Sequence, residues 1–354
     1  MVTTLAVVDD ALFDQHRALD RSGAPSPHPE RPERLQAARL AVRRLSERFG
    51  DETLRVSPLS PRDATHDELS RVHDAGYLSE LEQARGGTGY LDADTYYAPE
   101  SVAAAVRACG GSLALVDALL DGNADYGVAL LRPPGHHARP GAAMGFCMLN
   151  NVAVAAAHAR ARGVERVMIV DWDVHHGNGT QEMFFKDPSV LFASLHQFPF
   201  YPGTGATDEV GSADGKGYTL NVPLSAGAGD AAYLETARQL LAPVIAEYDP
   251  ELLLISAGFD AHARDPLAGM ALSAESYPRM LRELTGAWGR SARGRLGLLL
   301  EGGYDLTGLE TSLEATLSGL VDPLPAGPTT ERASSRHESE LWSARSAAKR
   351  FWKV

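Results

Sequence analysis

Short apolar runs alternate with longer amphipathic segments along most of this chain. About eight runs have the length and the composition of strands, and several carry too few polar residues to expose one face to water. They lie at residues 4–8, 53–59, 126–131, 166–170, 190–195, 218–222, 252–257 and 296–300. Because strands alternate with helical segments, the pattern predicts an α/β fold with a doubly wound, largely parallel sheet.

Helical periodicity predicts the elements between these strands. Residues 33–49, for example, place Leu35 and Ala38 on one apolar face. Gly110 and Gly111 fall inside another helical segment, and we interpret them as a packing feature because the lysine and threonine of a phosphate-binding loop are missing. The expected helices cover residues 33–49, 99–120, 151–162, 230–247, 273–288 and 338–354.

The chain has 354 residues, of which 44% are hydrophobic, enough for a large core. Its composition does not change abruptly before Pro323, so we expect a single large domain over residues 1–322. Residues 323–354 are expected to form a polar linker and a terminal helical segment. The side chains expected to dock that segment onto the domain are Leu341, Trp342, Phe351 and Trp352.

The charge and cysteine content narrow the class of protein. The net charge is −13, from 33 basic and 46 acidic residues, which argues against sequence-independent binding of nucleic acid. The two cysteines, Cys109 and Cys147, imply no disulfide framework and fit a reducing compartment. The N-terminus lacks a signal-peptide pattern, and we find no apolar run long enough for a bilayer. We therefore expect a cytoplasmic protein without membrane contact, and the sequence leaves its oligomeric state open.

Chemically active side chains follow five of the expected strands. The run at 166–170 leads into Asp171, the run at 126–131 into two histidines, and the run at 252–257 into Asp260. Residues 190–195 lead into His196, and residues 296–300 lead into Glu-Gly-Gly-Tyr. In open α/β sheets, ligands bind at the carboxyl ends of the strands. The sequence therefore predicts a functional site at this edge.

The segment after residue 170 carries the clearest metal-binding pattern. In an extended chain Asp173 and His175 point the same way, because side chains alternate with a period of two. This spacing suits two ligands of one metal ion, and Asp260 supplies a third. Three protein ligands leave a coordination position for water and substrate, as in catalytic zinc sites.

Several long motifs, in order, resemble the histone deacetylase superfamily, which includes the acetylpolyamine amidohydrolases. The motif at 28–34 is His-Pro-Glu-Arg-Pro-Glu-Arg, and Asn178 resembles the class II branch. The other motifs are Arg-Pro-Pro-Gly-His-His at 132–137, Gly-Phe-Cys at 145–147, Asp-Trp-Asp-Val-His-His-Gly-Asn-Gly-Thr at 171–180, Pro-Gly-Thr-Gly at 202–205, Ser-Ala-Gly-Phe-Asp at 256–260 and Glu-Gly-Gly-Tyr at 301–304. The resemblance implies the arginase/deacetylase fold, with a central eight-stranded parallel sheet flanked by helices. It also implies a deacetylase catalytic domain with one Zn²⁺ that hydrolyses an acetylated lysine or a similar acylated amine.

The resemblance also assigns catalytic roles. His137 would be the general base that deprotonates water and later protonates the leaving amine. His136 would lie beside Asp171, which orients it, and Tyr304 would donate a hydrogen bond to the developing oxyanion.

Further residues map onto a potassium site and the substrate tunnel. A structural K⁺ near the zinc ion would involve Asp171, Asp173, His175, Ser194 and Leu195. The tunnel and its rim would be formed by Asp94, Gly145, Phe146, Tyr201 and Leu267. Tyr201 stands where close relatives usually have phenylalanine. Leu267 favours acetyl-lysine or a neutral acylated amine, since polyamine-selective relatives tend to have an acidic residue near that position. We expect His176 and His262 to be structural, and His196 is open to a capping or a packing role.

Three alternatives compete with this interpretation. A binuclear manganese ureohydrolase shares the fold but needs extra carboxylates two residues beyond the shared ligands, where this chain has Gly177 and His262. A binding protein without catalysis would not need every ligand and both acid–base histidines. A deacetylase of acetylpolyamines or other small amides fits the acidic surface but not Leu267.

Overall fold

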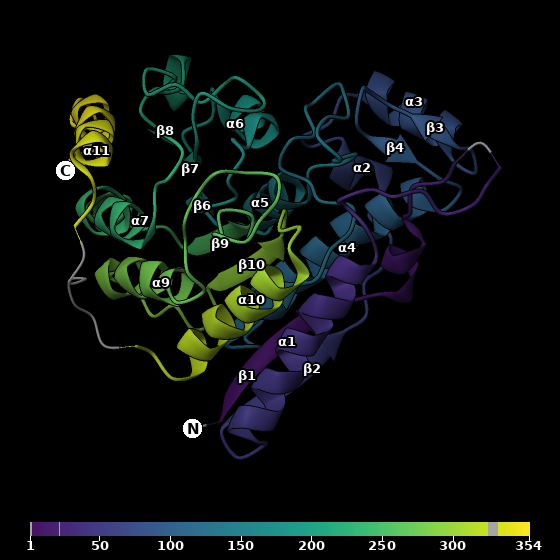
Figure 1. Cartoon of the computed structure of the whole chain (residues 1–354), viewed down its shortest axis with the longest axis horizontal. Helices are drawn as coiled ribbons and strands as arrows, with labels where there is room; N and C mark the ends of the chain where they lie inside the picture. The colour runs from purple at the N-terminus through teal and green to yellow at the C-terminus, as the bar shows by residue number, and fades with distance from the viewer. Residues whose placement is uncertain (1, 21, 325–331) are drawn as a thin grey trace.

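The computed structural model describes residues 2–20, 22–324 and 332–354 of the chain. The strands of the main sheet are β1 (Thr3–Val8), β2 (Leu54–Leu59), β5 (Tyr126–Ala129), β6 (Val167–Asp171), β7 (Val190–Gln197), β8 (Thr219–Leu224), β9 (Leu252–Ala257) and β10 (Leu296–Leu300). Within the described residues these eight strands are all parallel, in the order β2-β1-β5-β10-β9-β6-β7-β8 (Figure 1). A small antiparallel hairpin, β3 (Gly89–Tyr90) and β4 (Tyr96–Tyr97), lies apart from them. The prediction of a central eight-stranded parallel sheet is confirmed.

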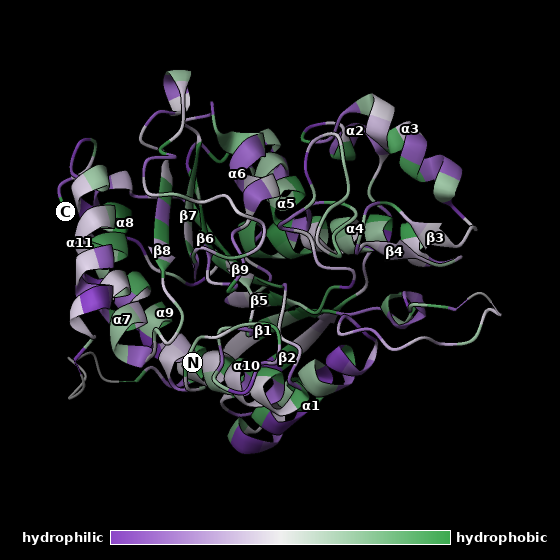
Figure 2. Ribbon diagram, turned by 45° about the horizontal axis from the view of Figure 1, so that its top comes forward, coloured by the Kyte–Doolittle hydropathy of each residue, from purple (hydrophilic) through white to green (hydrophobic). Residues whose placement is uncertain are grey.

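Helices cover both faces of the sheet. They are α1 (Glu33–Phe49), α2 (His66–Leu69), α3 (Ala75–Ala84), α4 (Ser101–Leu120), α5 (Asn151–Ala161), α6 (Asn178–Phe184), α7 (Asp230–Thr236), α8 (Ala242–Tyr248), α9 (Ser276–Ala287), α10 (Leu306–Val321) and α11 (Ser335–Ala348). Figure 2 shows α1 and α10 on one side of the sheet and α4 and α5 on the other. Apart from edge strand β2, the strands between the two layers are mostly buried and apolar, which explains their hydrophobic runs.

The positions of the elements follow the sequence pattern, with a few corrections. β7 extends through His196, which therefore lies inside the strand and not after it. β8 continues through Pro223, where we expected the strand to stop; β8 is the last strand of the sheet, and proline is tolerated on an edge strand. The segment at 230–247 forms α7 and α8, joined by a π-helical turn at Ala237–Leu241. Helices α2, α3, α6 and α10 were not predicted.

Helix α4 meets the length and hydropathy criteria for a membrane span, so the expectation that no run is long enough was wrong. Its most apolar window is 72% buried within the protein, and it packs against α5 and the sheet. Core packing therefore accounts for its composition. A Cβ atom on Gly110 would lie 1.7 Å from the carbonyl oxygen of Arg62, which confirms that this glycine permits close packing.

The C-terminal helix α11 packs along edge strand β8. Leu341 is buried, and the indole nitrogen of Trp352 donates to the carbonyl oxygen of Gly217 at 2.7 Å. Trp342 is 68% exposed, so the prediction that it docks the terminal segment is wrong. The predicted linker falls largely on residues 325–331, outside the described residues.

Candidate active site

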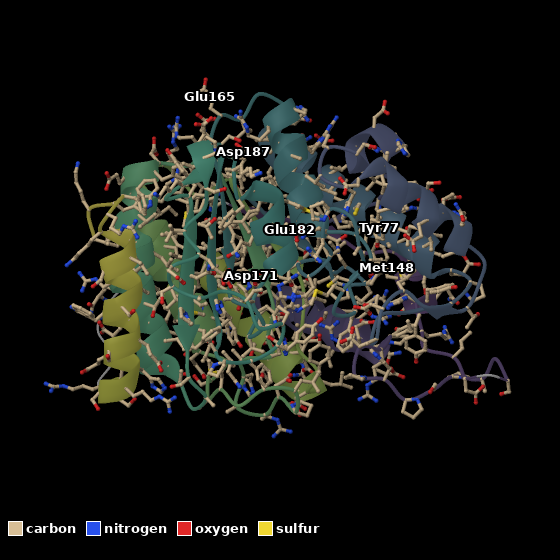
Figure 3. All side chains as sticks on the ribbon, turned by 90° about the horizontal axis from the view of Figure 1, so that it is seen from above. Tyr77, Met148, Glu165, Asp171, Glu182 and Asp187 are labelled. Atoms are coloured by element: carbon tan, nitrogen blue, oxygen red, sulfur yellow. The ribbon has the colours of Figure 1, made fainter. Side chains whose placement is uncertain are left out.

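The five strands with chemically active ends are neighbours in the sheet. β5, β10, β9, β6 and β7 follow one another in the sheet order, although they are widely separated along the chain. Figure 3 shows the consequence for β6: Glu165, before the strand, projects at the surface, whereas Asp171, at its carboxyl end, lies in the interior. The predicted convergence at one edge is therefore found.

The structure brings Asp173, His175 and Asp260 together. One potential ligand atom from each lies within 4.8 Å of the others. The Nδ1 atom of His175 is 3.2 Å from Oδ1 of Asp173 and 3.2 Å from Oδ2 of Asp260. Both aspartates are fully buried and the histidine is nearly so. Two carboxylates and one imidazole form a donor set that zinc and similar divalent ions accept.

The electrostatics of this cluster fit a cation. Burial alone lowers the pKa of His175, but its hydrogen bonds to Asp173 and Asp260 outweigh burial and raise that pKa to about 10. Burial, followed by the charge of Asp173, raises the pKa of Asp260 to about 7. A site that retains a proton this strongly has the negative field that a divalent cation needs. The residues present therefore fit a metal ion.

Backbone amides orient the two carboxylates. The N–H of Gly302 donates to Oδ2 of Asp173 at 2.7 Å, and the N–H of Val174 donates to Oδ1 of Asp260 at 2.8 Å. A Cβ atom on Gly302 would lie 2.1 Å from Oδ2 of Asp260, and one on Gly258 would lie 2.2 Å from Oδ2 of Asp173. Only glycine permits this approach, so the motifs around residues 258 and 302 shape the cluster as much as its ligands do.

Two adjacent histidines lie beside the cluster in different environments. Nδ1 of His136 donates to Oδ2 of Asp171 at 2.9 Å, whereas Nδ1 of His137 is 2.8 Å from Oδ1 of Asn178. Burial opposes charge on His136, but Asp171 and Asp173 outweigh it and raise the pKa well above the usual 6.5. Burial, and then the charge of His136, lower the pKa of His137 well below 6.5. These surroundings favour the charged form of His136 and the neutral form of His137.

Glu301, whose role the sequence analysis missed, holds the histidine loop. Its Oε2 atom accepts the N–H of Gly135 at 2.7 Å and the N–H of His136 at 3.1 Å. Burial raises the pKa of this carboxyl to about 7. The sequence did contain a signal for this role. A glutamate directly after a buried apolar strand is itself expected to be buried, and a buried carboxylate needs hydrogen-bond donors.

Tyr304 follows β10, and burial together with the nearby carboxylates of Asp260 and Asp173 raises its pKa well above 10. Arg34 is fully buried, and its Cζ atom lies 4.9 Å from the centre of the Tyr304 ring. Nε of Arg34 donates to the carbonyl oxygen of Gly303 at 2.7 Å. Gly303 has φ of 117°, a conformation that favours glycine. The ring of Phe146 meets Tyr304 edge to face, with centroids 6.0 Å apart.

Two of the predicted tunnel residues, Gly145 and Tyr201, lie beside His137. Gly145 has φ of 56°, and a Cβ atom there would lie 2.5 Å from the ring of His137. The Tyr201 ring meets His137 edge to face at 5.2 Å, and Tyr201 is 37% exposed. Asp94 and Leu267 are half-buried. Burial and the neighbouring carboxylate of Asp92 raise the pKa of Asp94.

The residues predicted for a potassium site, and the two histidines expected to be structural or capping, lie on or next to β7. Ser194 and Leu195 are buried in β7, next to β6. Oγ of Ser194 is 3.0 Å from Nδ1 of His196, whose Nε2 atom is 2.9 Å from the carbonyl oxygen of Gly205. Both ring nitrogens of His196 are thus occupied, which favours a packing role. His176 is likewise paired through both nitrogens, to Thr204 and Gln181.

The positions that a second metal would require do not favour it. A Cβ atom on Gly177 would lie 2.2 Å from Oδ2 of Asp171, so a carboxylate side chain has no room there. Nδ1 of His262 accepts the N–H of Arg264 at 3.2 Å and is turned toward its own loop. This geometry supports a site for one metal ion.

Comparison with known proteins shows the family. The profile of the histone deacetylase domain matches residues 28–320. The chain is 40% identical to "Probable deacetylase" of Archaeoglobus fulgidus over 79% of this chain and 77% of that protein. It is 43% identical to "Histone deacetylase-like amidohydrolase" of Pseudomonas aeruginosa over 71% of this chain and 67% of that one. The chain therefore belongs to the histone deacetylase family, and the recognition made from its motifs is confirmed.

Two further similarities extend over nearly the whole chain. Human "Polyamine deacetylase HDAC10" is 42% identical over 92% of this chain, which corresponds to 49% of the human protein. The crystal structure of the HDA15 HD domain superimposes with a TM-score of 0.89 and 37% identity, covering 99% of this chain and 96% of that one. The fold is thus the arginase/deacetylase fold, and the family membership makes the chain a hydrolase of the deacetylase/amidohydrolase type.

Proposed function

We propose that this protein is a zinc-dependent deacetylase that removes acetyl groups from lysine side chains or from similar acylated amines. The observation that supports this most directly is the buried cluster of Asp173, His175 and Asp260 beside the paired histidines. A metal-ligand set, a neutral histidine and a tyrosine at one sheet edge are the parts that metal-assisted amide hydrolysis needs. The deacetylases and amidohydrolases among the relatives support the same reaction class.

Asp173, His175 and Asp260 would hold the zinc ion. When bound, zinc supplies Lewis-acid polarisation of the acyl carbonyl and of water. The two aspartates balance the charge of the ion, and such a site acidifies water less than a site of neutral ligands does. A separate general base is therefore needed.

His137 is that base in this proposal. An amide oxygen only accepts hydrogen bonds, so the contact with Asn178 places the proton of His137 on Nδ1 and leaves Nε2 free to take a proton from water. The same Nε2 later returns a proton to the leaving amine. His136, charged and bonded to Asp171, stabilises the negative charge that develops in the transition state.

Tyr304 would donate its hydroxyl hydrogen to the oxygen of the tetrahedral intermediate. Phe146 and Tyr201 would flank the extended chain of the substrate, and the buried position of the site excludes bulk water. Water exclusion strengthens each of these electrostatic contributions.

The rim favours one substrate class. Leu267 offers no charge to a cationic polyamine tail, which supports acetyl-lysine or a neutral acylated amine. Asp94 would accept a hydrogen bond from the substrate near the rim. The acidic net charge and the similarity to a human polyamine deacetylase favour acetylpolyamines as a second candidate.

Two further elements belong to the proposal. A structural K⁺ would be bound near the zinc ion by Asp171, Asp173, His175, Ser194 and Leu195, mostly through backbone oxygens. The enzyme would act in the cytoplasm, which the lack of a disulfide framework supports, since Cys109 and Cys147 are both free and buried.

A substrate panel tests the function. The purified protein loaded with zinc is assayed for acetate release from an acetyl-lysine peptide, acetylputrescine and acetylspermidine, and kcat/KM is compared. We expect turnover that is abolished by chelation and restored by Zn²⁺, with the highest kcat/KM for the peptide. An inert zinc-loaded protein would support the non-catalytic alternative, and a preference for acetylspermidine would support the polyamine alternative.

A further inference from the structure

Asp265 binds two loops of the active site with the two oxygens of one carboxylate. Oδ2 accepts the N–H of Tyr304 at 2.6 Å and the N–H of Asp305 at 3.1 Å. Oδ1 accepts the N–H of Leu267 at 3.0 Å. Asp265 is only 7% exposed, and all three donors are backbone amides. One side chain therefore fixes the backbone of the oxyanion tyrosine and of a rim residue together.

The hydrogen bond from the N–H of Tyr304 to Asp265 lies between two residues that other hydrogen bonds already hold in place. Gly303 precedes the tyrosine in a positive-φ conformation and is bonded to Arg34. Asp305 follows it and caps helix α10 by accepting the N–H of Gly308 at 2.7 Å. With both ends held, the amide of Tyr304 sets the direction of its side chain, and Asp265 is the acceptor of that amide.

The bond to Leu267 holds the other loop. Leu267 lies at the expected rim, two residues beyond Asp265, and Gly269 of the same loop donates its N–H to Gln197 at 2.8 Å. Pro266 and Tyr304 both line one cavity of about 660 Å³. A ligand in this cavity would therefore contact residues of both loops that the Asp265 carboxylate connects.

We propose that Asp265 is a positioning residue that couples the placement of the Tyr304 hydroxyl to the geometry of the substrate rim at Leu267. This inference rests on the proposed deacetylase function, because it gives Tyr304 an oxyanion to stabilise. Asp265 itself does not touch the reacting atoms. It acts through Tyr304 on the chemical step and through Leu267 on substrate binding.

Asparagine at position 265 separates these roles. Its shape is nearly the same, but one oxygen becomes an NH₂ group that faces backbone donors and cannot accept from them. One of the two loops therefore loses its acceptor, and a buried N–H is left without a partner. Misplacement of a catalytic group by about 1 Å can lower kcat by about a hundredfold.

A double-mutant cycle tests the coupling. Wild type, Asp265→Asn, Tyr304→Phe and the double variant are compared, each loaded with zinc, on an acetyl-lysine peptide. We expect Asp265→Asn to lower kcat about tenfold or more in the wild-type background and by less than about twofold in the Tyr304→Phe background, because the hydroxyl it positions is then absent. Its effect on KM, which acts through Leu267, should persist in both backgrounds.

Matched controls separate this from general damage. Glu275→Gln removes an exposed carboxylate with no cap bond from the same connecting segment and should leave kcat and KM unchanged. Zinc content measured by elemental analysis should be equal in all variants. An equal loss of kcat in both backgrounds would overturn the proposal, whereas an inactive wild type would instead refute the proposed function.

Hydrogen exchange provides a measurement that needs no variant. In the unmodified protein, the amides of Leu267, Tyr304 and Asp305 should become exchangeable together, because they share one acceptor. Independent exchange of the amides in the two loops would contradict the coupling. This test uses the unmodified protein, so it holds even if Asp265→Asn does not fold.

Discussion

The two adjacent histidines differ in the side chain that each one is hydrogen-bonded to, and this sets the charge that each ring favours. The rings of His136 and His137 are 4.0 Å apart and equally buried. The first is bonded to a carboxylate, which stabilises a positive charge, and the second to an amide oxygen, which fixes a neutral tautomer. In the proposed mechanism, the division between proton transfer and charge stabilisation therefore depends on the identity of residues 171 and 178.

This difference predicts which of the two histidine-to-alanine substitutions lowers kcat more. His137→Ala removes the proposed general base, a contribution of about 10²–10⁴ in rate. His136→Ala removes only a stabilising charge and should lower kcat less. Single-turnover kinetics on an acetyl-lysine peptide measure both, with zinc content as the control. A larger loss for His136→Ala would exchange the two roles.

The hydroxyl of Tyr304 gives a second prediction at the residue scale. Tyr304→Phe preserves the ring contacts with Arg34 and Phe146. We expect the same melting temperature as the wild type and a loss of about 2–4 kcal/mol of transition-state stabilisation in kcat. A kcat within about twofold of the wild type would remove Tyr304 from the mechanism.

The candidate metal-ligand residues could be predicted from the sequence, whereas the carboxylates that hold the surrounding loops could not. Asp173 and His175 carry a local signal, the alternation of an extended segment, and Asp260 repeats it at another strand end. Glu301 and Asp265 act on backbone amides far along the chain, and a carboxylate that accepts an amide has no sequence signature of its own. Only the folded arrangement identifies these partners.

At the element scale, the sheet order turns distant segments into one site. The strand ends were predicted to converge, and their succession as β5, β10, β9, β6 and β7 comes from crossovers that the sequence does not specify. The His196 boundary was missed because the apolar strand runs on through a buried, doubly bonded imidazole. Polarity alone does not mark the end of such a strand.

The loop before α1 is attached to this edge by a buried carboxylate. Both oxygens of Glu30 accept from the guanidinium of Arg132, and Oε1 also accepts from Nη1 of Arg34 at 3.1 Å. All three side chains are fully buried. Burial alone would raise the pKa of Glu30, but Arg132 and the other partners hold it well below 4.5. Glu30 therefore links the N-terminal loop, the exit of β5 and the loop of Tyr304.

Glu30→Gln should destabilise the protein by about 3–5 kcal/mol, because it leaves two guanidinium groups buried without their charge partner. The carboxylate has a depressed pKa in the folded state, so its contribution is complete above the unfolded pKa of about 4.3 and falls as the pH drops below that value. Urea unfolding of wild type and variant at several pH values measures this difference. The expected gap is constant between about pH 6 and 8 and narrows in acid.

A control for that measurement lies three residues away. Glu33 is half-exposed, and its carboxylate forms a loose surface ion pair with Nε of Arg31 at 4.0 Å. Glu33→Gln should therefore change the free energy of unfolding by less than about 1 kcal/mol. If Glu30→Gln behaved like Glu33→Gln, the buried network would contribute nothing to the fold.

At the scale of the whole molecule, the C-terminal segment closes the exposed edge of the sheet. α11 packs along β8, and Oε2 of Glu340 accepts the N–H of Ser225 at 3.0 Å. Arg345 donates to Gln239 at 2.8 Å. An uncovered edge strand invites pairing with other chains, so the helix protects the sheet. The division of the chain at residue 322 stays a prediction, since these contacts join the terminal helix to the sheet without testing that boundary.

Two tryptophans of this terminal segment provide the last prediction. Trp352 is partly buried against Tyr218 and Tyr248 and donates to Gly217, so Trp352→Ala should cost roughly 2 kcal/mol from lost apolar burial and one hydrogen bond. Trp342 is 68% exposed, and Trp342→Ala should change stability by less than about 0.5 kcal/mol. Thermal unfolding compares the two variants, and kcat should be unchanged in both because neither side chain touches the catalytic edge. Equal destabilisation by the two substitutions would mean that the helix is held by its backbone and other side chains, and that Trp352 does not anchor it.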